Sequence, residues 1–524
     1  MYKLKYLYTK MKLKGMISLC MAGFAAAGFA QTHVEGEEYY KAGQYNNAYN
    51  LLERSLSNPQ TDKAVSNYYL GSYWILGKDL SKAKNFFNAG IQANPESPLN
   101  YVGLGKLALM ANDLKGAKDQ FKLAEKYGKK DPAVTIAIAR AYYDVDPVQY
   151  GQDIEKLIAK AQKQDMENPD IYIFMGDMER DAKNIGSAAG KYDMAKNYDP
   201  KSAVAYVKNA ELYHQVNPSL SISSLKELLV NNPSSALGQH ELAETYEELQ
   251  DYKNAAIEYG KYVENPAHFK SDESKYAFLL YYDQQFKKGY DYATALLAED
   301  PSNYDAQRYQ LLNASNLPEL STQLLPMAEA LYATHKADPK NKPLAFVDYF
   351  TIMTLLNNNR RFDEAASIIQ EGIENPNLGK FRNQLMDAKF QTYMRGAKTM
   401  MSDGLQEGKN GNQEKAEQLY NTGLDFGEKA SGVLPESFEP QFITGTIASL
   451  KGDLPRAAML YEEAAAKIEN AGVQGNESSA KTIYKVLGDY FYGNKENEKA
   501  KTYYGKYLEL DPANEDVAAK VANL

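Results

Sequence analysis

The chain has 524 residues, of which 44% are hydrophobic and 24% charged, a composition typical of folded globular proteins. Its formal net charge is −9, so it lacks the cationic excess that neutralises nucleic-acid phosphates, and nucleic acid is excluded as the expected partner. A single cysteine, Cys20, excludes a disulfide framework.

Residues 1–30 have the pattern of a secretory signal peptide. Five lysines between Lys3 and Lys14 precede the apolar run GMISLCMAGFAAAGFA, which ends in small residues before Gln31. This run is shorter than the roughly 20 apolar residues that a membrane span needs, and cleavage is expected after Ala30. Cleavage changes the formal charge from −9 to −14, because five lysines and no acidic residue are removed, and it leaves a mature chain without cysteine.

Three alternatives for this segment stay open. Translation from Met11 would give a more compact signal, and an uncleaved segment would serve as an N-terminal anchor. Lipidation of Cys20 is the third alternative. The bulky Leu19 before it and the apolar residues after it argue against a lipoprotein site.

A fixed spacing of small and aromatic residues recurs along the rest of the chain. Alanine follows glycine after twelve residues, and an aromatic residue follows that alanine after four. The units with this spacing are Gly71, Ala83 and Phe87; Gly105, Ala117 and Phe121; Gly176, Ala188 and Tyr192; Gly445, Ala457 and Tyr461; and Gly488, Ala500 and Tyr504. Ala243, Ala255 and Tyr259 have the same intervals, with alanine in place of glycine.

Small residues at these positions predict a close approach of two helices. A glycine inside a helix costs about 1 kcal/mol relative to alanine, so contact with another element must require it. We expect Gly71 on the first helix to face Ala83 on the second, with Phe87 and Trp74 filling the space beside them. Pro95 should end the second helix, because proline has no amide hydrogen and clashes with the preceding turn.

The spacing resembles the tetratricopeptide repeat, which has a period of about 34 residues and the pattern W-x2-L-G-x2-Y, then A-x3-F, then P. The first tryptophan of that pattern is usually absent here, and Asn67, Tyr101, Tyr172 and Tyr484 hold its place. The resemblance implies an all-α fold, a right-handed superhelical solenoid of antiparallel helix pairs in which each pair buries its apolar face against its neighbours.

Interruptions of the pattern divide the chain. We expect a signal peptide at 1–30, a regular array at 31–305, irregular or extended units at 306–440, a C-terminal pair at 441–512 and a capping helix at 513–524. The interruptions are DVDP after Tyr143, SNLPELS at 315–321, the polar loop GKNGNQEK at 408–415 and NAGVQGNESS at 470–479.

No catalytic constellation is recognisable, and no catalytic, cofactor-binding or metal-binding residue is expected. The histidines after residue 30 are scattered singly, without the paired spacing that helical metal sites use. The stretch from Gly396 to Thr399 is similar to the end of a phosphate loop, but it lacks the upstream glycine and the preceding strand. The sequence therefore predicts a protein that is not an enzyme.

In the repeat family the first helix of each pair lines a concave groove that holds partner segments. If Leu70 and Gly71 occupy positions 7 and 8 of the repeat, positions 5, 9 and 12 point into that groove. The residues predicted to bind a partner there are Tyr68, Ser72, Asp177, Arg180, His240, Glu244, Phe278, Tyr281, Lys485, Asp489 and Tyr492. The lysine and asparagine clamp that some family members use for chaperone C-termini is not found, so that ligand is not expected.

Together these features predict a non-catalytic scaffold or adaptor of the Gram-negative cell envelope, exported to the periplasm or the outer membrane. Its partners would be proteins of an envelope complex, with peripheral association with outer-membrane proteins left open and no membrane span in the mature chain. The alternative is an accessory module that binds glycans or cell-wall fragments, because tyrosines can stack on sugar rings. Tyr192, Tyr259, Tyr461 and Tyr504 are, however, already committed to packing in the repeat.

Overall fold

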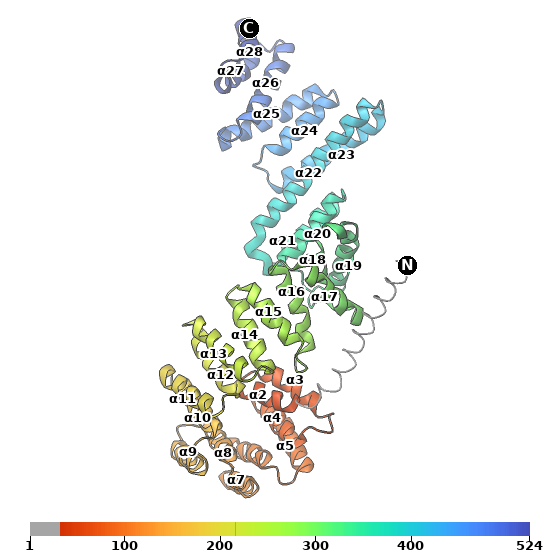
Figure 1. The fold of residues 1–524 in the computed structure, drawn as a ribbon. Coiled ribbons are helices and arrows are strands. Elements are labelled where there is room, and N and C mark those ends of the chain that lie inside the picture. The colour runs from red at the N-terminus through yellow and green to blue at the C-terminus, as the bar shows by residue number, and fades with distance from the viewer. Residues whose placement is uncertain (1–31, 215) are drawn as a thin grey trace, which may run out of the picture. The chain divides into compact units, whose positions relative to one another are not determined.

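The computed structural model describes residues 32–214 and 216–524, and every element in these ranges is helical. Consecutive helices pack as antiparallel pairs, which confirms the predicted all-α solenoid (Figure 1). The expected signal peptide, its cleavage after Ala30, the alternative start at Met11 and the lipidation alternative at Cys20 lie outside the described residues. No helix in the described part of the chain combines the length and the apolar character needed to cross a bilayer.

The chain divides into two compact units, and the boundary between them in the sequence lies between Leu296 and Leu297. The helices of the first unit are α2 (Thr32–Lys41), α3 (Tyr45–Ser55), α4 (Lys63–Leu76), α5 (Leu80–Ala93), α6 (Pro98–Met110), α7 (Leu114–Gly128), α8 (Pro132–Val145), α9 (Gly151–Gln164), α10 (Pro169–Asp181), α11 (Ile185–Tyr198), α12 (Ala203–His214), α13 (Pro218–Asn231), α14 (Ala236–Glu248), α15 (Tyr252–Val263), the short η1 (Lys270–Asp272) and α16 (Glu273–Tyr282). Helix α17 (Phe286–Glu299) crosses the boundary.

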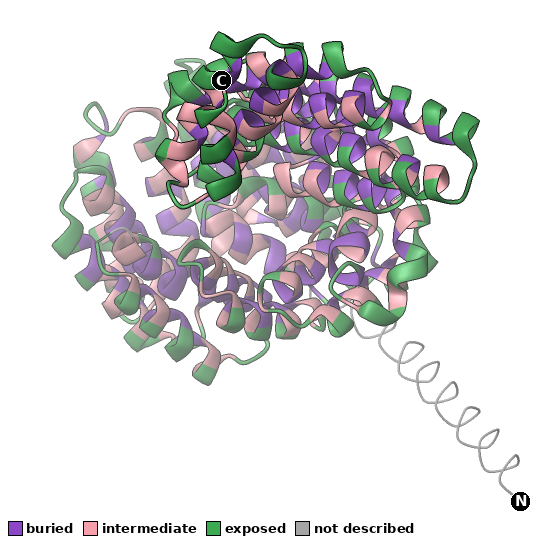
Figure 2. Ribbon diagram, turned by 90° about the horizontal axis from the view of Figure 1, so that it is seen from above, coloured by how far each residue is buried: buried purple, intermediate pink, exposed green. Residues whose placement is uncertain are grey.

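The second unit continues the succession of helix pairs. Its helices are α18 (Tyr304–Ala314), η2 (Pro318–Gln323), α19 (Leu324–Ala337), α20 (Phe346–Asn358), α21 (Phe362–Glu374), η3 (Pro376–Phe381), α22 (Arg382–Lys409), α23 (Gln413–Val433), α24 (Glu439–Leu450), α25 (Leu454–Ala471), α26 (Glu477–Gly493), α27 (Asn497–Leu510) and α28 (Glu515–Ala522). Exposed residues gather on the loops and outer turns, and buried residues lie where helices face one another (Figure 2).

The turn inside a pair is built the same way in several repeats. A residue with positive φ, such as Lys78 or Asn112, is followed by an aspartate that caps the second helix. The carboxylate of Asp79 accepts the backbone N–H of Lys82 at 2.9 Å, and Asp113 caps α7 in the same way. Because an N-cap carboxylate satisfies a backbone N–H that the helix leaves unpaired, these short turns start the second helix at a defined residue.

The small residue on the first helix is required by the aromatic ring of the second. A methyl group at Gly71 would lie 2.5 Å from Phe87, and one at Gly488 would lie 2.4 Å from Tyr504. The three atoms nearest to such a methyl group at Gly71 all belong to Phe87, and the expectation that Gly71 faces Ala83 stays a prediction. Phe87 also contacts Gly103 of the next pair. The ring therefore joins two neighbouring repeats.

The interruptions in the sequence correspond to features of the helices. Residues 146–150 form a longer turn between α8 and α9, and η2 precedes α19 where the pattern breaks at 315–321. Helices α22 and α23 are the longest pair, and only residues 410–412 separate them, so most of the predicted polar loop is helical. In α28 the side chain of Val517 is fully buried in a cluster with residues of the preceding helix pairs, and the capping role of this helix stays a prediction.

Candidate functional site: the inner faces of the two units

The first helix of each pair lines the inner face of the array. Helices α4, α6, α8, α10, α12 and α14 contact one another from pair to pair, whereas the second helices of neighbouring pairs do not approach to the same extent. This is the face on which the sequence predicts a partner-binding groove.

In the first unit this inner face is covered by the chain's own N-terminal helix pair. Helix α2 packs against α4 and also against α12 and α14. The ring of Tyr39 meets Phe269 edge-on at 5.4 Å, and Lys41 pairs with Asp170 at 3.1 Å across 129 residues of sequence. A single buried cluster joins residues of α2 and α3 to residues of α12 and α14. The first unit therefore closes on itself.

Several residues predicted to bind a partner face this N-terminal pair. The hydroxyl of Tyr40 interacts with Ser72, and the ring of Tyr68 lies beside Tyr69, which itself packs on Tyr40. The amide of Gln44 donates to Glu241, next to His240. A partner on this face would have to displace α2, and binding through these residues stays a prediction.

Asp177, another predicted residue, lies at the centre of a buried polar network. Its carboxylate accepts hydrogen bonds from Lys208 and Arg140, each at 2.8 Å, and from the hydroxyl of Tyr192 at 2.9 Å. Arg180 lies 3.8 Å away. Burial alone raises the pKa of Asp177, but the two nearby cations outweigh it and hold the pKa at about 2. Asp177 is therefore ionised and fully partnered within the protein.

The same residue types recur at a fixed spacing in two other repeats, one of which makes both contacts and the other only the acid–lysine pair. Tyr192 follows Asp177 after 15 residues, and Lys208 follows it after 31. Asp489 likewise accepts from Tyr504 at 2.7 Å and from Lys520 at 2.8 Å, at the same intervals. In a third repeat Glu244 pairs with Lys275 at 2.6 Å, 31 residues later, but the hydroxyl of Tyr259, 15 residues after Glu244 in the sequence, is buried without a hydrogen-bond partner.

We call this arrangement the acid–tyrosine–lysine triad. The acid lies on the first helix of a pair, the tyrosine on the second, and the lysine on the first helix of the following pair or on α28. Ion pairs thus link successive repeats along the inner face. Three of the predicted partner-binding residues, Asp177, Glu244 and Asp489, are members of triads, and the structure gives each of them an internal cation.

The remaining predicted residues are more accessible. Phe278 and Tyr281 on α16 are half-buried and pack with Tyr282 at centroid distances of 4.7 and 5.3 Å. On α26, Lys485 pairs with Asp489 at 2.9 Å, and Tyr492 is 40% exposed.

The closed face of the first unit contains a carboxyl pair, Glu35 and Glu38, one turn apart on α2. Oε2 of Glu35 is buried and has no hydrogen-bond partner. Burial raises the pKa of Glu35 to about 7. Burial, together with the charges of Glu35 and Glu37, raises the pKa of Glu38 to about 8. Both groups are therefore more easily protonated in the folded than in the unfolded protein.

This pair predicts a stability that falls with rising pH. Each carboxyl group has a higher pKa in the folded protein than in the unfolded chain, where it is about 4.5. The resulting stabilisation of the folded state is complete below pH 4.5 and is lost as the pH rises through about 7 and 8. In urea unfolding of the full chain, the double substitution Glu35→Gln and Glu38→Gln should flatten the decline of the first unit's midpoint over this window. The exposed Glu53→Gln is the control, and an unchanged pH dependence in the double variant would show that the pair does not cause it.

The inner face of the second unit has an open groove between α20 and α22. Its apolar end is formed by Phe346, Phe350 and Met353 of α20 together with Ala388 of α22. The polar residues that also line this end are Asn357, Asn383, Gln384, Asp387 and Thr392. The groove has a volume of about 740 Å³ here, and the ring of Phe346 stacks on Phe381 at 4.2 Å, which fixes its position.

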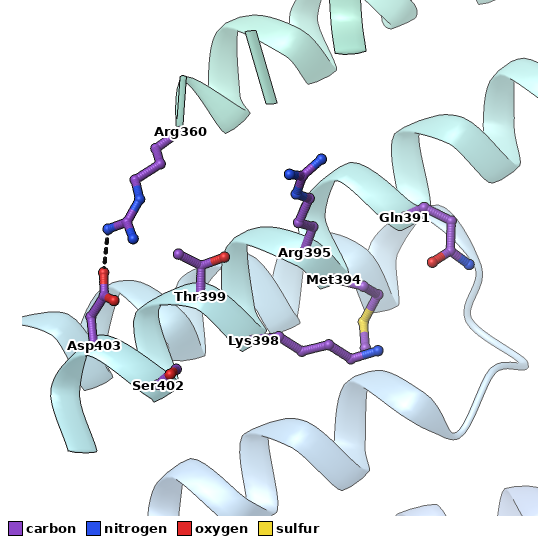
Figure 3. Close-up of a pocket in the computed structure, with 8 residues that line it drawn as sticks. All are labelled: Arg360, Gln391, Met394, Arg395, Lys398, Thr399, Ser402 and Asp403. Atoms are coloured by element: carbon purple, nitrogen blue, oxygen red, sulfur yellow. Dashed lines mark hydrogen bonds and ion pairs between the residues drawn. The ribbon is translucent and has the colours of Figure 1, made fainter. Parts of the chain in front are cut away.

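The groove continues along α22 into a cationic end. Two residues, Gln391 and Arg395, line both ends of the groove. The other residues that line the cationic end are Arg360, Met394, Lys398, Thr399, Ser402 and Asp403. Arg360 stands on the turn after α20 with a φ of 60° and pairs with Asp403. Figure 3 shows Arg395 and Thr399 pointing from α22 toward the side from which Arg360 reaches across.

Sequence reasoning missed this groove for two identifiable reasons. Met353 stands twelve residues before Ala365, at the position where other repeats have glycine. The glycine by which the repeat is recognised in the sequence is therefore absent here. In α22 the repeat spacing does exist, as Gly404, Ala416 and Tyr420, and a methyl group at Gly404 would lie 2.7 Å from Tyr420. The groove residues of α22 precede Gly404, on the additional turns of a 28-residue helix.

Within the described ranges, no group of three histidine, cysteine or acidic side chains is placed to hold a metal ion. The open groove combines an apolar end, several amides and three cationic side chains, which can bind and orient another molecule.

No family model matches the sequence, and no curated protein matches it. Solved structures that resemble the fold include the Naa15/Naa10 complex bound to HypK, at 15% identity over 91% of this chain and 68% of that chain, with a TM-score of 0.29. PilF of Pseudomonas aeruginosa is 16% identical over 41% of this chain and 97% of its own, with a TM-score of 0.28. The type IV pilus biogenesis factor PilW is 14% identical over 47% and 96%, with a TM-score of 0.25.

The fold assignment rests on the repeat geometry. Paired helices recur with the interval of twelve and four residues, and the aromatic ring of the second helix occupies the notch at the glycine of the first. Interlocked pairs of this kind cannot bury their apolar faces alone and are stable only as a stack. The described chain therefore has the fold of a tetratricopeptide-repeat solenoid.

Proposed function

We propose that the protein is a non-catalytic scaffold of the bacterial cell envelope and that it binds a segment of a partner protein in the open groove between α20 and α22. The observation that carries this proposal is the contrast between the two inner faces. The first is covered by α2, whereas the second keeps a groove with exposed Arg360, Gln391, Arg395 and Lys398.

The division of the chain that the sequence predicts is part of this proposal. The regular array at 31–305 would serve as a self-contained support, and the irregular part at 306–440, which contains the groove, would hold the partner. Export by residues 1–30 would place the protein in the periplasm or at the outer membrane. A groove lined by amides and cations suits polypeptide backbone and acidic side chains, because each amide both donates and accepts hydrogen bonds.

A site-specific crosslinking experiment tests this proposal. A photoreactive amino acid at Gln391, in the groove, should give a covalent adduct with one envelope protein in living cells. The same amino acid at Gln418, which is also an exposed glutamine but lies on α23 outside the groove, is the control. The captured protein should then bind the purified chain directly, and Arg395→Glu should weaken that binding. Equal adducts at the two positions, or none at Gln391, would contradict the proposal.

The alternative function, binding of glycans or cell-wall fragments, is favoured by aromatic side chains at the groove's apolar end. Phe346 and Phe350 are half-buried, with faces that a sugar ring could contact. Direct binding of purified cell-wall fragments to the full chain, abolished by Phe350→Ala, would support this alternative over a protein partner.

A further inference from the structure

The two ends of the groove between α20 and α22 differ in chemistry but are continuous. At one end, the rings of Phe346 and Phe350 and the side chain of Met353 form an apolar floor. At the other end, Arg395 of α22 and Arg360 of the turn opposite it lie on the same side of α22, whereas Lys398 extends from the other side of this helix (Figure 3). A ligand that fills the groove must meet both surfaces.

The charge at the cationic end is only partly balanced by the protein. Asp403, the acidic residue lining this end, is already paired with Arg360. The guanidinium of Arg395 donates to the neutral side chain of Asn358 at 3.1 Å, and Lys398 is 3.9 Å from Glu439, at the limit of an ion pair. In a chain with a net charge of −9, this local positive excess is the opposite of the average surface. Charge complementarity therefore favours an anionic ligand group here.

The opposite end disfavours such a group. Asp387 lies two helical turns before Arg395 on the same face of α22 and lines the apolar end. A carboxylate placed beside Asp387 would be repelled, whereas an apolar side chain could contact Phe350 and Met353. The groove thus distinguishes the two directions in which a segment could lie.

The distance between the ends sets a spacing for the ligand. Ala388 and Arg395 are seven residues apart on α22, which corresponds to about 10 Å along the helix axis. About three residues of extended chain cover this distance, at roughly 3.3 Å each.

We propose that the partner segment carries a bulky apolar side chain and, about three residues away in extended conformation, an acidic side chain. The apolar side chain would lie on Phe346, Phe350 and Met353, and the carboxylate would pair with Arg395. This inference rests on the proposed function, because it assumes that the groove binds a polypeptide, and it adds the chemical class and the direction of that polypeptide.

Selection from a random library of displayed 12-residue peptides on the full chain tests this inference. Selected peptides should be enriched in an aromatic or large aliphatic residue with aspartate or glutamate about three positions away. Fluorescence anisotropy with such a peptide should show about tenfold or greater weakening by Arg395→Glu, since a charge-assisted contact is lost and a repulsive one is gained. Phe350→Ala should also weaken binding, and the exposed Lys501→Glu on α27 should leave it unchanged.

The outcomes separate this inference from the proposed function. Peptides that bind through Phe350 but are not acidic, or are insensitive to Arg395→Glu, would overturn the inference while leaving the groove as a protein-binding site. A selection that yields no groove-dependent peptide would overturn the inference as well, and the crosslinking from Gln391 would still decide the proposed function independently.

Discussion

Replacing Asp177 with alanine should destabilise the first unit by about 3–5 kcal/mol, the usual effect of removing one partner from a buried ion pair. The side chains of Asp177 and Lys208 are only 5% and 6% exposed. Without the carboxylate, the ammonium of Lys208 stays buried with no counter-charge, and the hydroxyl of Tyr192 loses its acceptor. Urea unfolding of the full chain, followed by circular dichroism, should show this loss as a lower midpoint for the first unit's transition.

The triad of the C-terminal repeat supplies a matched control. Asp489 also binds a tyrosine and a lysine at the same sequence intervals, but its side chain is 40% exposed and that of Lys520 is 28% exposed. Because water can solvate both charges, Asp489→Ala should cost only about 1–2 kcal/mol, mainly from the lost ion pair and the hydrogen bond of Tyr504. If the two substitutions were equally costly, the burial of the first triad could not be the cause.

A second variant tests the origin of the effect. If the loss comes from the unpaired ammonium, Asp177→Ala combined with Lys208→Met should be less destabilising than Asp177→Ala alone, because the buried charge is then removed with its partner. A double variant as unstable as the sum of the two single variants would instead indicate that each side chain contributes independently.

The helix pairs and their order could be predicted from the sequence because the packing of a repeat is local. Gly71 and Phe87 are 16 residues apart, and the same interval separates Gly488 from Tyr504. The physical requirement, a notch opposite a ring, acts within one helix pair and is therefore visible as a spacing. Spacing identifies which residues belong to a contact but not which atoms of the second helix lie closest.

The closure of the first unit could not be predicted in this way. Lys41 and Asp170 are 129 residues apart, and Gln44 and Glu241 are 197 apart. Such contacts depend on how small rotations between successive helix pairs add up. The spacing of residues within one repeat does not reveal this cumulative rotation. The consequence for function is large, because residues counted as groove-lining from their repeat positions lie against α2.

The open groove escaped prediction because it lies where the repeat is irregular. The additional turns of α22 carry Gln391, Arg395 and Lys398, and these residues have no counterpart in a regular repeat. A regular array presents similar side chains at each step. A longer helix introduces a stretch with its own composition, and here that stretch is cationic. Irregular units in such arrays are therefore places to look for specific binding.

The notch at the glycine makes a second prediction of large effect, in the C-terminal pair. Gly488→Ala would place a methyl group 2.4 Å from the fully buried ring of Tyr504, and the ring cannot withdraw because its hydroxyl is held by Asp489. We expect a loss of about 1–3 kcal/mol in stability, as is usual for overpacking. Thermal unfolding of the full chain, with hydrogen exchange of α26 and α27 to localise the change, would measure it.

Gly505, on the opposite helix of the same pair, gives the control for this substitution. No atom lies within 4 Å of a methyl group built there, so Gly505→Ala should stabilise α27 by up to about 1 kcal/mol through helix propensity alone. A ring faces Gly488 but not Gly505, so opposite signs are expected from the same chemical change. Stabilisation by both substitutions would mean that α26 and α27 pack less closely than the notch requires. The stacking of repeats would then have to come from contacts other than the aromatic ring.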